Sequence, residues 1–334
     1  MNCMSTPDPH SHSGRRWRVA PPYLKGPLQS STRLHKILRI VLLDRFIPRI
    51  SGNGCTEPVF VEALSLCFAT AADIVSGFIF GLTVAPNLVE DRARAIAYQR
   101  AHSAASSPKM MFWAQELPSM CGLMSYLCLD LKISKKAKSF LEAEILSLCK
   151  RAEATRFNRN AIQAESSSFP GLYYHLREAS TQLQVASEVL DHLKATGEIL
   201  SITVTQALYE LSRNNHIQLA LRSELSTLWR TTTAELPSAK DLVALPLLNA
   251  VVQETLRLRP TAPDGQPRTS PIANSDLFGY QVPANVRIST YSHLLHRAGP
   301  FDMRPGTDIE PRHWAFGIGA RDCLGKHMAT QGQY

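Results

Sequence analysis

Residues 316–325 read Phe316-Gly317-Ile318-Gly319-Ala320-Arg321-Asp322-Cys323-Leu324-Gly325, which places one cysteine between two glycines. Gly319 and Gly325 permit backbone conformations closed to other residues, so the chain can approach a flat ligand closely. Amide N–H groups turned toward the sulfur would stabilise a thiolate and tune the potential of a bound metal. Arg321 supplies a positive charge for an anionic group, and Phe316 an apolar cover over the sulfur. The stretch therefore favours a metal-thiolate loop over the alternative, a buried cysteine in a glycine-rich turn.

Composition describes a folded globular protein. The chain has 334 residues, of which 44% are hydrophobic and 19% charged, with a formal net charge of +8. A basic chain can bind nucleic acid. However, the Lys and Arg residues are scattered and no recognition motif occurs, so we expect no nucleic-acid partner. A basic face for an acidic redox partner explains the charge more simply.

Seven widely spaced cysteines suggest neither a zinc site nor a disulfide framework. No CxxC pair exists, and the number is odd. We therefore expect a reducing compartment and no disulfide-linked partner. The cysteines other than Cys323 are ordinary small apolar residues in this interpretation: Cys3, Cys55, Cys67, Cys121, Cys128 and Cys149.

No secretory signal or membrane span is expected. Residues 1–18 are polar and contain two prolines. The most apolar stretch, residues 60–85, is interrupted by Glu62 and Asp73 and is interpreted as a buried helix. A membrane span would require about 20 uninterrupted apolar residues.

Apolar spacing predicts a mainly α fold with a minor β part. We expect residues 1–30 to be irregular, because Pro21, Pro22 and Pro27 limit any helix. A long proline-free segment predicts a central helix over 181–213. A polar loop is expected over 156–168, and short strands after Pro260, such as 286–291. Further helices are expected over 34–43, 57–80, 88–104, 216–229 and 247–259.

The pattern F-x-x-G-x-R-x-C-x-G in residues 316–325 closely resembles the heme-binding loop of the cytochrome P-450 family, the heme-thiolate monooxygenases. All five defining positions match. The resemblance implies heme b as cofactor, with Cys323 as the ligand of its iron. It also implies that Phe316, Gly319, Arg321 and Gly325 contact the cofactor.

A second similarity lies in Glu254-Thr255-Leu256-Arg257, within a segment that resembles the family's K-helix. Residues three apart share a helix face, so the glutamate and arginine can pair. The resemblance implies a structural ion pair, which we expect to be buried, joined by a downstream arginine. Arg304 is the candidate for that arginine and Arg312 the alternative. A solvated surface pair is the other interpretation of this motif.

Two further segments resemble parts that hold the heme propionates. Arg268, in Gln266-Pro267-Arg268, matches a propionate-binding arginine, although a surface arginine in a proline-rich loop remains the alternative. Residues 12–17 resemble the family's basic helix, which implies His12 and Arg16 as contacts to the other propionate. A surface metal pair formed by His10 and His12 is the alternative there.

The expected central helix resembles the family's oxygen-activating helix at Ala195-Thr196-Gly197-Glu198-Ile199. Glu198 matches the acid of that motif, but Ile199 occupies the position of the threonine. Isoleucine cannot donate a hydrogen bond, so proton delivery should be impaired. Ser201, on a similar face, is a candidate substitute acting through water. The alternative for Glu198 is a helix-surface carboxylate.

The resemblance implies a single heme-thiolate domain over 1–334, with the family's N-terminal anchor region and C-terminal end absent. A fungal-type monooxygenase of secondary metabolism, fed by an NADPH-dependent reductase and acting on a small apolar substrate, is the function implied. The alternative is a non-catalytic truncated fragment with weak or no heme binding. Members of this type are anchored in the endoplasmic reticulum membrane, but no transmembrane segment is expected here, so the localisation stays open.

Overall fold

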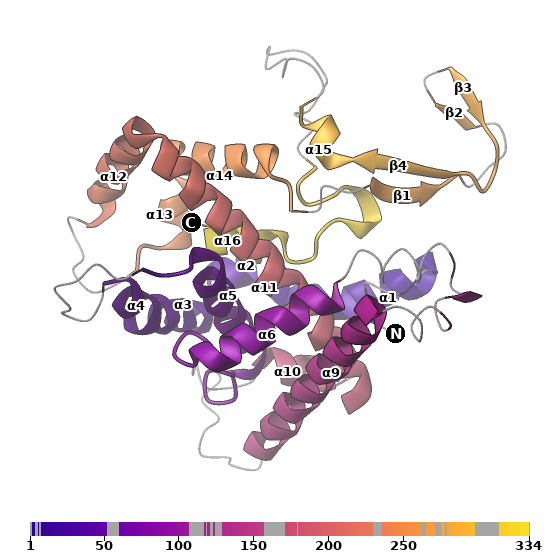
Figure 1. Ribbon diagram of the computed structural model, residues 1–334, viewed down its shortest axis with the longest axis horizontal. Helices are drawn as coiled ribbons and strands as arrows, with labels where there is room; N and C mark the ends of the chain where they lie inside the picture. Colours follow the sequence, from indigo (N-terminus) through magenta and orange to yellow (C-terminus); the bar gives the residue numbers. More distant parts are fainter. Residues whose placement is uncertain are drawn as a thin grey trace.

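A computed structural model of the chain describes residues 2–3, 6, 8–51, 60–106, 117, 119–120, 123, 129–156, 171–178, 180–229, 236–261, 265–270, 275–277, 279–297 and 314–333. The fold in these residues is mainly α with a minor β part, as predicted (Figure 1). The expected loop over 156–168 lies almost wholly outside the described residues.

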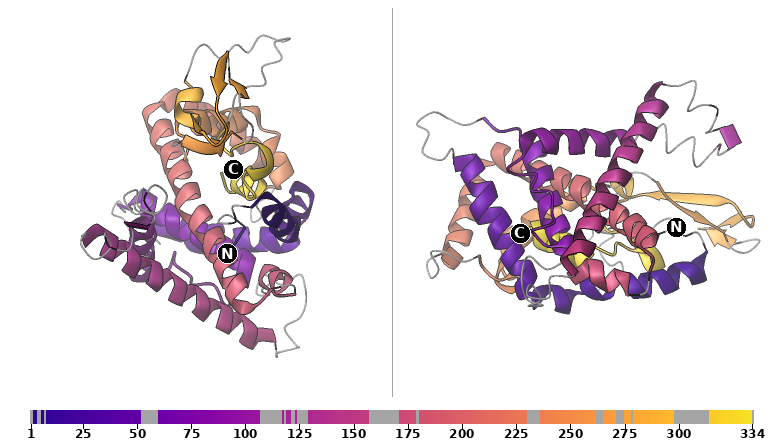
Figure 2. Two further views of the ribbon diagram at one scale, coloured as in Figure 1. Left: turned by 90° about the vertical axis from the view of Figure 1, so that its right-hand side faces the viewer. Right: turned by 90° about the horizontal axis from the view of Figure 1, so that it is seen from below.

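The central helix is α11 (Gln182–Arg213), and its bounds agree with the prediction to one residue. A capping box starts it, because the Thr181 hydroxyl accepts the Gln184 N–H and the Gln184 side chain accepts the Thr181 N–H. Helix α11 contacts helices from the N-terminal, middle and C-terminal parts of the described chain. It therefore connects the two ends of the helical body (Figures 1 and 2).

The main core forms where α5 (Ala63–Phe80) crosses α11. Glu62 caps α5, and nearly every residue from Cys67 onward is buried. Gly197 of α11 lies against Phe68, since a Cβ there would stand 3.3 Å from the phenylalanine ring. Among the described helices only α5 has the length and composition of a membrane span, and 78% of it is buried within the protein. The expectation that Asp73 would make this segment too polar for a membrane span is therefore wrong by length and composition. The expectation of a buried helix is confirmed.

The other helices mostly follow the predicted segments. Residues 34–43 fall in α3 (Thr32–Arg39) and the π-helical η2 (Ile40–Phe46), followed by α4 (Ile47–Ser51). Further along lie α6 (Arg92–Ala105), α9 (Leu129–Arg156), α10 (Gly171–Arg177), α12 (Asn215–Trp229), α13 (Ala239–Val243) and α14 (Pro246–Leu258).

The prediction of an irregular segment over residues 1–30 is wrong. The structure has α1 (Pro9–Val19), the 3₁₀ turn η1 (Pro21–Tyr23) and α2 (Lys25–Gln29) there. Four prolines lie within the first three residues of these elements, where a backbone N–H has no partner inside the helix: Pro9, Pro21, Pro22 and Pro27. Asp8 caps α1 by accepting the Ser11 N–H at 2.7 Å. The prolines therefore begin these elements instead of preventing them.

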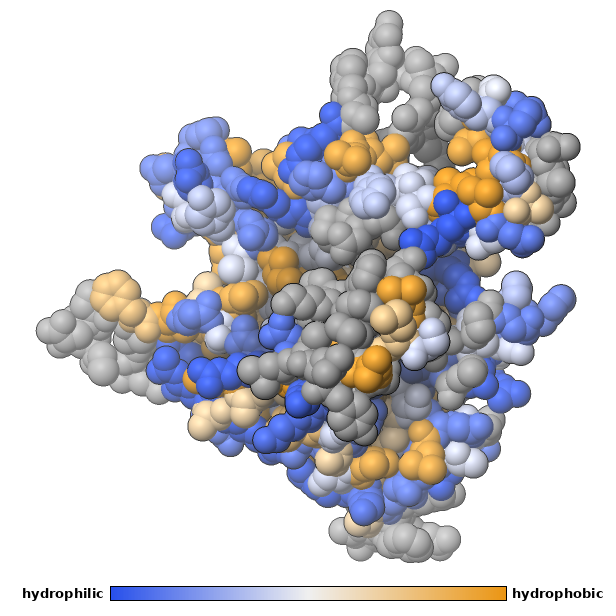
Figure 3. All heavy atoms as spheres, turned by 45° about the vertical axis from the view of Figure 1, so that its right-hand side comes forward, coloured by the Kyte–Doolittle hydropathy of each residue, from blue (hydrophilic) through white to orange (hydrophobic). Residues whose placement is uncertain are grey.

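The β part projects from one end of the helical body (Figures 1 and 2). Strand β1 (Gly265–Thr269) pairs antiparallel with β4 (Arg287–Tyr291), and β2 (Ser275–Leu277) pairs antiparallel with β3 (Tyr280–Val282). Helix α15 (Ser292–Leu295) follows β4 directly. The described chain then resumes at Trp314 and runs through the 3₁₀ turn η5 (Gly319–Arg321) into α16 (Lys326–Gln333). On the face drawn in Figure 3, the described residues are mostly hydrophilic, with apolar areas between them.

Candidate functional site

The cysteine loop is a tight turn closed by its own backbone. The Cys323 N–H donates to the Phe316 carbonyl at 2.8 Å, and the Asp322 N–H donates to the Gly319 carbonyl at 3.0 Å. Gly319 has φ +80° and Gly317 has φ +68°, in the left-handed region that favours glycine. The motif singled out Gly319 but gave no role to Gly317, which the turn requires equally. Together these contacts place Cys323 just before the first turn of α16.

The Cys323 residue is exposed, whereas the other cysteines in the described part of the chain are buried. Desolvation by the surrounding loop nevertheless raises the pKa of its thiol, and the charge of Asp322 raises it further. The Gly325 N–H and the positive charges of Arg16 and Lys326 act in the opposite direction. A thiolate here would therefore meet a backbone donor and two cations once a metal replaced the proton.

Helix α1 brings two of the predicted residues to the cysteine loop. His12 and Arg16 are four apart and share a face of α1. The Arg16 guanidinium donates to the Asp322 carbonyl at 2.8 Å and pairs with its carboxylate at 2.5 Å. Arg321 donates to the Thr6 carbonyl at 2.8 Å. His12 is buried, and desolvation followed by the charges of Arg321 and Arg16 lowers its pKa. His12, Arg16 and Arg321 thus form one basic group, named here the basic cluster.

Arg268 is not joined to the basic cluster by any contact among the described residues. It lies on β1 opposite Ile288, is exposed, and donates to the Pro267 carbonyl at 2.9 Å. Its role toward a propionate stays a prediction.

The oxygen-activation candidates lie in the middle of α11. Glu198 is half-buried, and Ile199 is 38% exposed. Ser201 is buried, and its hydroxyl donates to the Glu198 carbonyl at 2.8 Å. That hydroxyl hydrogen is therefore already used within the helix. The relay role of Ser201 stays a prediction, and it would require this bond to be exchanged for one to water.

The Glu254–Arg257 pair forms, but it is not the buried pair that the sequence suggested. Both guanidinium contacts measure 2.7 Å, and the side chains are 53% and 26% exposed, respectively. The pair stands on the outer side of α14, and Arg257 reaches inward to donate to the His296 carbonyl at 3.1 Å. Arg304 and Arg312, the two candidates for a third member, lie outside the described residues. His296 was missed, because a histidine after a short helix carries no signal of its own.

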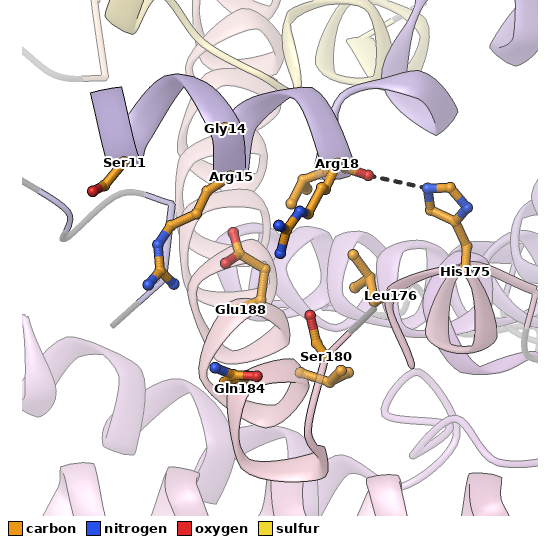
Figure 4. A pocket seen from close by; sticks show the side chains of 11 residues that line it. Ser11, Gly14, Arg15, Arg18, His175, Leu176, Ser180, Gln184 and Glu188 are labelled. Carbon is orange, nitrogen blue, oxygen red and sulfur yellow. Dashed lines mark hydrogen bonds between the residues drawn. The ribbon is translucent and has the colours of Figure 1, made fainter. Parts of the chain in front are cut away.

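A cavity of about 320 Å³ lies on the other side of α1, between that helix, α10 and α11 (Figure 4). Arg15, Arg18 and Glu188 line it, and a ring nitrogen of His175 is hydrogen-bonded to the Arg18 carbonyl at 3.1 Å. Cys323 is not among its lining residues. Helix α1 therefore separates this polar cavity from the cysteine loop.

Comparisons with known proteins agree with the resemblance. The family model described as Cytochrome P-450 matches residues 68–332. The human mitochondrial 25-hydroxyvitamin D-1 alpha hydroxylase is 32% identical over 195 residues, covering 54% of this chain and 38% of that protein. The Aspergillus terreus cytochrome P-450 monooxygenase tazI is 29% identical over 161 residues, covering 45% and 32%, respectively. The chain thus spans about a third of the length of these curated relatives.

Solved structures show the same fold. The retinoic acid-bound cyanobacterial CYP120A1 has a TM-score of 0.71 at 18% identity, covering 99% of this chain and 71% of its own. The cytochrome P-450 CYP102L1 has a TM-score of 0.66 at 18% identity, covering 95% and 68%, respectively. The fold of this chain is therefore a partial version of theirs. Because the family model matches most of the chain and the cysteine loop carries the family's pattern, the chain belongs to the cytochrome P-450 family.

Proposed function

We propose that this chain binds heme b through Cys323 and serves as the heme-binding part of a monooxygenase. The observation that carries the proposal is the free Cys323 thiol just before α16, next to the basic cluster. The family implies a heme cofactor with iron. The residues present fit it: a free thiol for the iron, glycine backbone beside the thiol, and basic side chains for two carboxylates.

Each residue then has a definite task. Cys323 holds the iron as a thiolate, while the Gly325 N–H and Arg16 offset its negative charge. His12, Arg16 and Arg321 orient the propionates, and Arg268 is a further candidate from the β part. When bound, thiolate-ligated heme supplies the activation of dioxygen and the cleavage of its O–O bond.

Proton delivery is the weakest part of this site. Glu198 is the group that would hold a proton near the cofactor, and Ile199 beside it has no hydroxyl to order a water. Ser201 has a hydroxyl, but it donates to the Glu198 carbonyl. The substrate is a small apolar molecule in this proposal, and electrons come from an NADPH-dependent reductase. The net charge of +8 suits a partner with an acidic surface.

The test is a visible spectrum of the reduced, carbon-monoxide-treated protein after loading with hemin. We expect the red-shifted Soret band of thiolate ligation in the wild type and in Cys67→Ala, and its loss in Cys323→Ala. Cys67 is the matched control because it is a buried cysteine on α5, away from the loop. A thiolate-type band that survives in Cys323→Ala would overturn the ligand assignment. A folded wild type that takes up no hemin would leave the alternative, a non-catalytic fragment.

A further inference from the structure

His296 is a polar side chain with no exposed surface, placed directly after α15. Both of its ring nitrogens have backbone partners. Nδ1 lies 3.2 Å from the Arg257 carbonyl oxygen, and Nε2 accepts the Trp314 N–H at 2.8 Å. Its own carbonyl accepts the Arg257 guanidinium at 3.1 Å. One residue thus joins the end of α14, the end of α15 and the segment that leads into the cysteine loop.

These partners determine which ring nitrogen carries the hydrogen. A backbone N–H can only donate, so Nε2 must be the acceptor for Trp314. A backbone carbonyl can only accept, so Nδ1 must carry the hydrogen that points to Arg257. Both bonds form together only in the neutral imidazole protonated at Nδ1. The arrangement is therefore specific to histidine among the common side chains.

The connection continues to Cys323 through short steps of the backbone. Trp314 lies two residues before Phe316, and the Phe316 carbonyl accepts the Cys323 N–H. The Trp314 carbonyl accepts the Gly317 N–H at 3.0 Å, which begins the turn. A shift of Trp314 would consequently displace the first residue of the turn that holds the sulfur.

We propose that His296 is the positioning residue that anchors the cysteine loop to α14, through its neutral Nδ1–H form. In this arrangement the Glu254 carboxylate orients the Arg257 guanidinium, which donates a hydrogen bond to the His296 carbonyl. His296 has this role whether or not heme binds, so its test does not depend on the proposed function.

The side chains of asparagine and glutamine separate the two ring contacts. Asparagine places its amide near the position of Nδ1, so His296→Asn can keep the bond to Arg257 but loses the acceptor for Trp314. Glutamine extends to the position of Nε2, so His296→Gln restores that acceptor. The matched control is His293→Asn on α15, because His293 is half-buried and bonds only to Arg297 among the described residues.

The experiment measures amide hydrogen exchange of Trp314 and nitrogen chemical shifts of the His296 ring in the full chain. We expect the Nδ1–H form in the wild type. In His296→Asn the Trp314 amide hydrogen should exchange about tenfold faster than in the wild type, a factor that corresponds to about 1.4 kcal/mol. The amides of α11 should keep their protection. His296→Gln and His293→Asn should exchange as the wild type does.

Three results would overturn the assignment: an Nε2–H ring in the wild type, unchanged Trp314 exchange in His296→Asn, or no recovery in His296→Gln. Site-resolved alkylation of Cys323 provides a second readout of the loop. It should become faster in His296→Asn and stay unchanged in the control. If His296→Asn does not fold, the ring measurement on the wild type still tests the proposal, because a hydrogen on Nε2 would rule out the bond from the Trp314 N–H.

Discussion

Asp73 provides a test of the core that needs no cofactor. Its carboxylate lies inside α5 with no exposed surface and accepts the N–H groups of Leu88 at 2.7 Å and Val89 at 3.0 Å. Arg45 stands 3.6 Å away, too far for a hydrogen bond. Burial outweighs these three favourable partners and raises the pKa of Asp73 from 3.8 to about 6. The folded protein therefore holds this proton over a pH range in which the unfolded chain has lost it.

The sign of the stability change follows from that difference. A raised carboxyl pKa means that the folded state binds more protons between pH 3.8 and about 6, so the contribution of Asp73 to stability falls as pH rises through this window. A shift of about two units corresponds to about 3 kcal/mol. Asp73→Asn has no titrating group and should remove this loss.

The assay is urea unfolding of the wild type and Asp73→Asn at pH 4, 5, 6 and 7. We expect the free energy of unfolding of the wild type, relative to that of the variant, to fall by about 2 kcal/mol over the series, because part of the loss has already occurred at pH 4. Asp44→Asn is the matched control, since the Asp44 side chain is 52% exposed. A relative stability that is flat with pH would mean that the two N–H donors and Arg45 balance burial, and one that rises with pH would mean that they outweigh it.

Three more predictions concern single positions. In urea unfolding, Gly197→Leu should lower the free energy of unfolding by about 1–3 kcal/mol, because the new side chain overpacks against Phe68. The control Gly14→Leu should not lower it, because a Cβ at Gly14 meets nothing within 4 Å. Glu254→Ala should cost no more than about 1 kcal/mol in the same assay, because its ion pair is exposed; a loss above about 3 kcal/mol would restore the buried-pair interpretation. In hemin-loaded protein, Ile199→Thr should shift reducing equivalents from peroxide toward substrate oxidation, and an already tight coupling in the wild type would contradict this.

The sequence predicted the fold best where local signals act alone. Helix α11 has a capping box at Thr181 and no proline, so its bounds follow from its own residues. The misjudged N-terminal segment shows the opposite case. Prolines stop a helix in its interior but suit its first turn, and the sequence alone does not indicate which position Pro27 takes in α2.

The candidate site was predictable only as far as its motif extends. The pattern singled out Cys323 and Arg321 as candidates, and the resemblance of residues 12–17 added His12 and Arg16. The structure places these two residues beside the cysteine loop. His296 could not be found this way, because its role comes from backbone groups of segments 39 and 18 residues away along the chain. The exposure of Glu254 likewise depends on how α14 packs, which the i, i+3 spacing leaves undetermined.

The contacts between α1 and the cysteine loop have a consequence for how the site is made. Arg16 and Asp322 are 306 residues apart, and Thr6 and Arg321 are 315 apart. Closing loops over such separations is entropically costly. These contacts should therefore form after the chain between the paired residues has become ordered. During synthesis α1 leaves the ribosome before the cysteine loop does. A chain stalled before Arg321 presents the face of His12 and Arg16 without the loop that contacts it, so this part of the site can assemble only after the cysteine loop has been made.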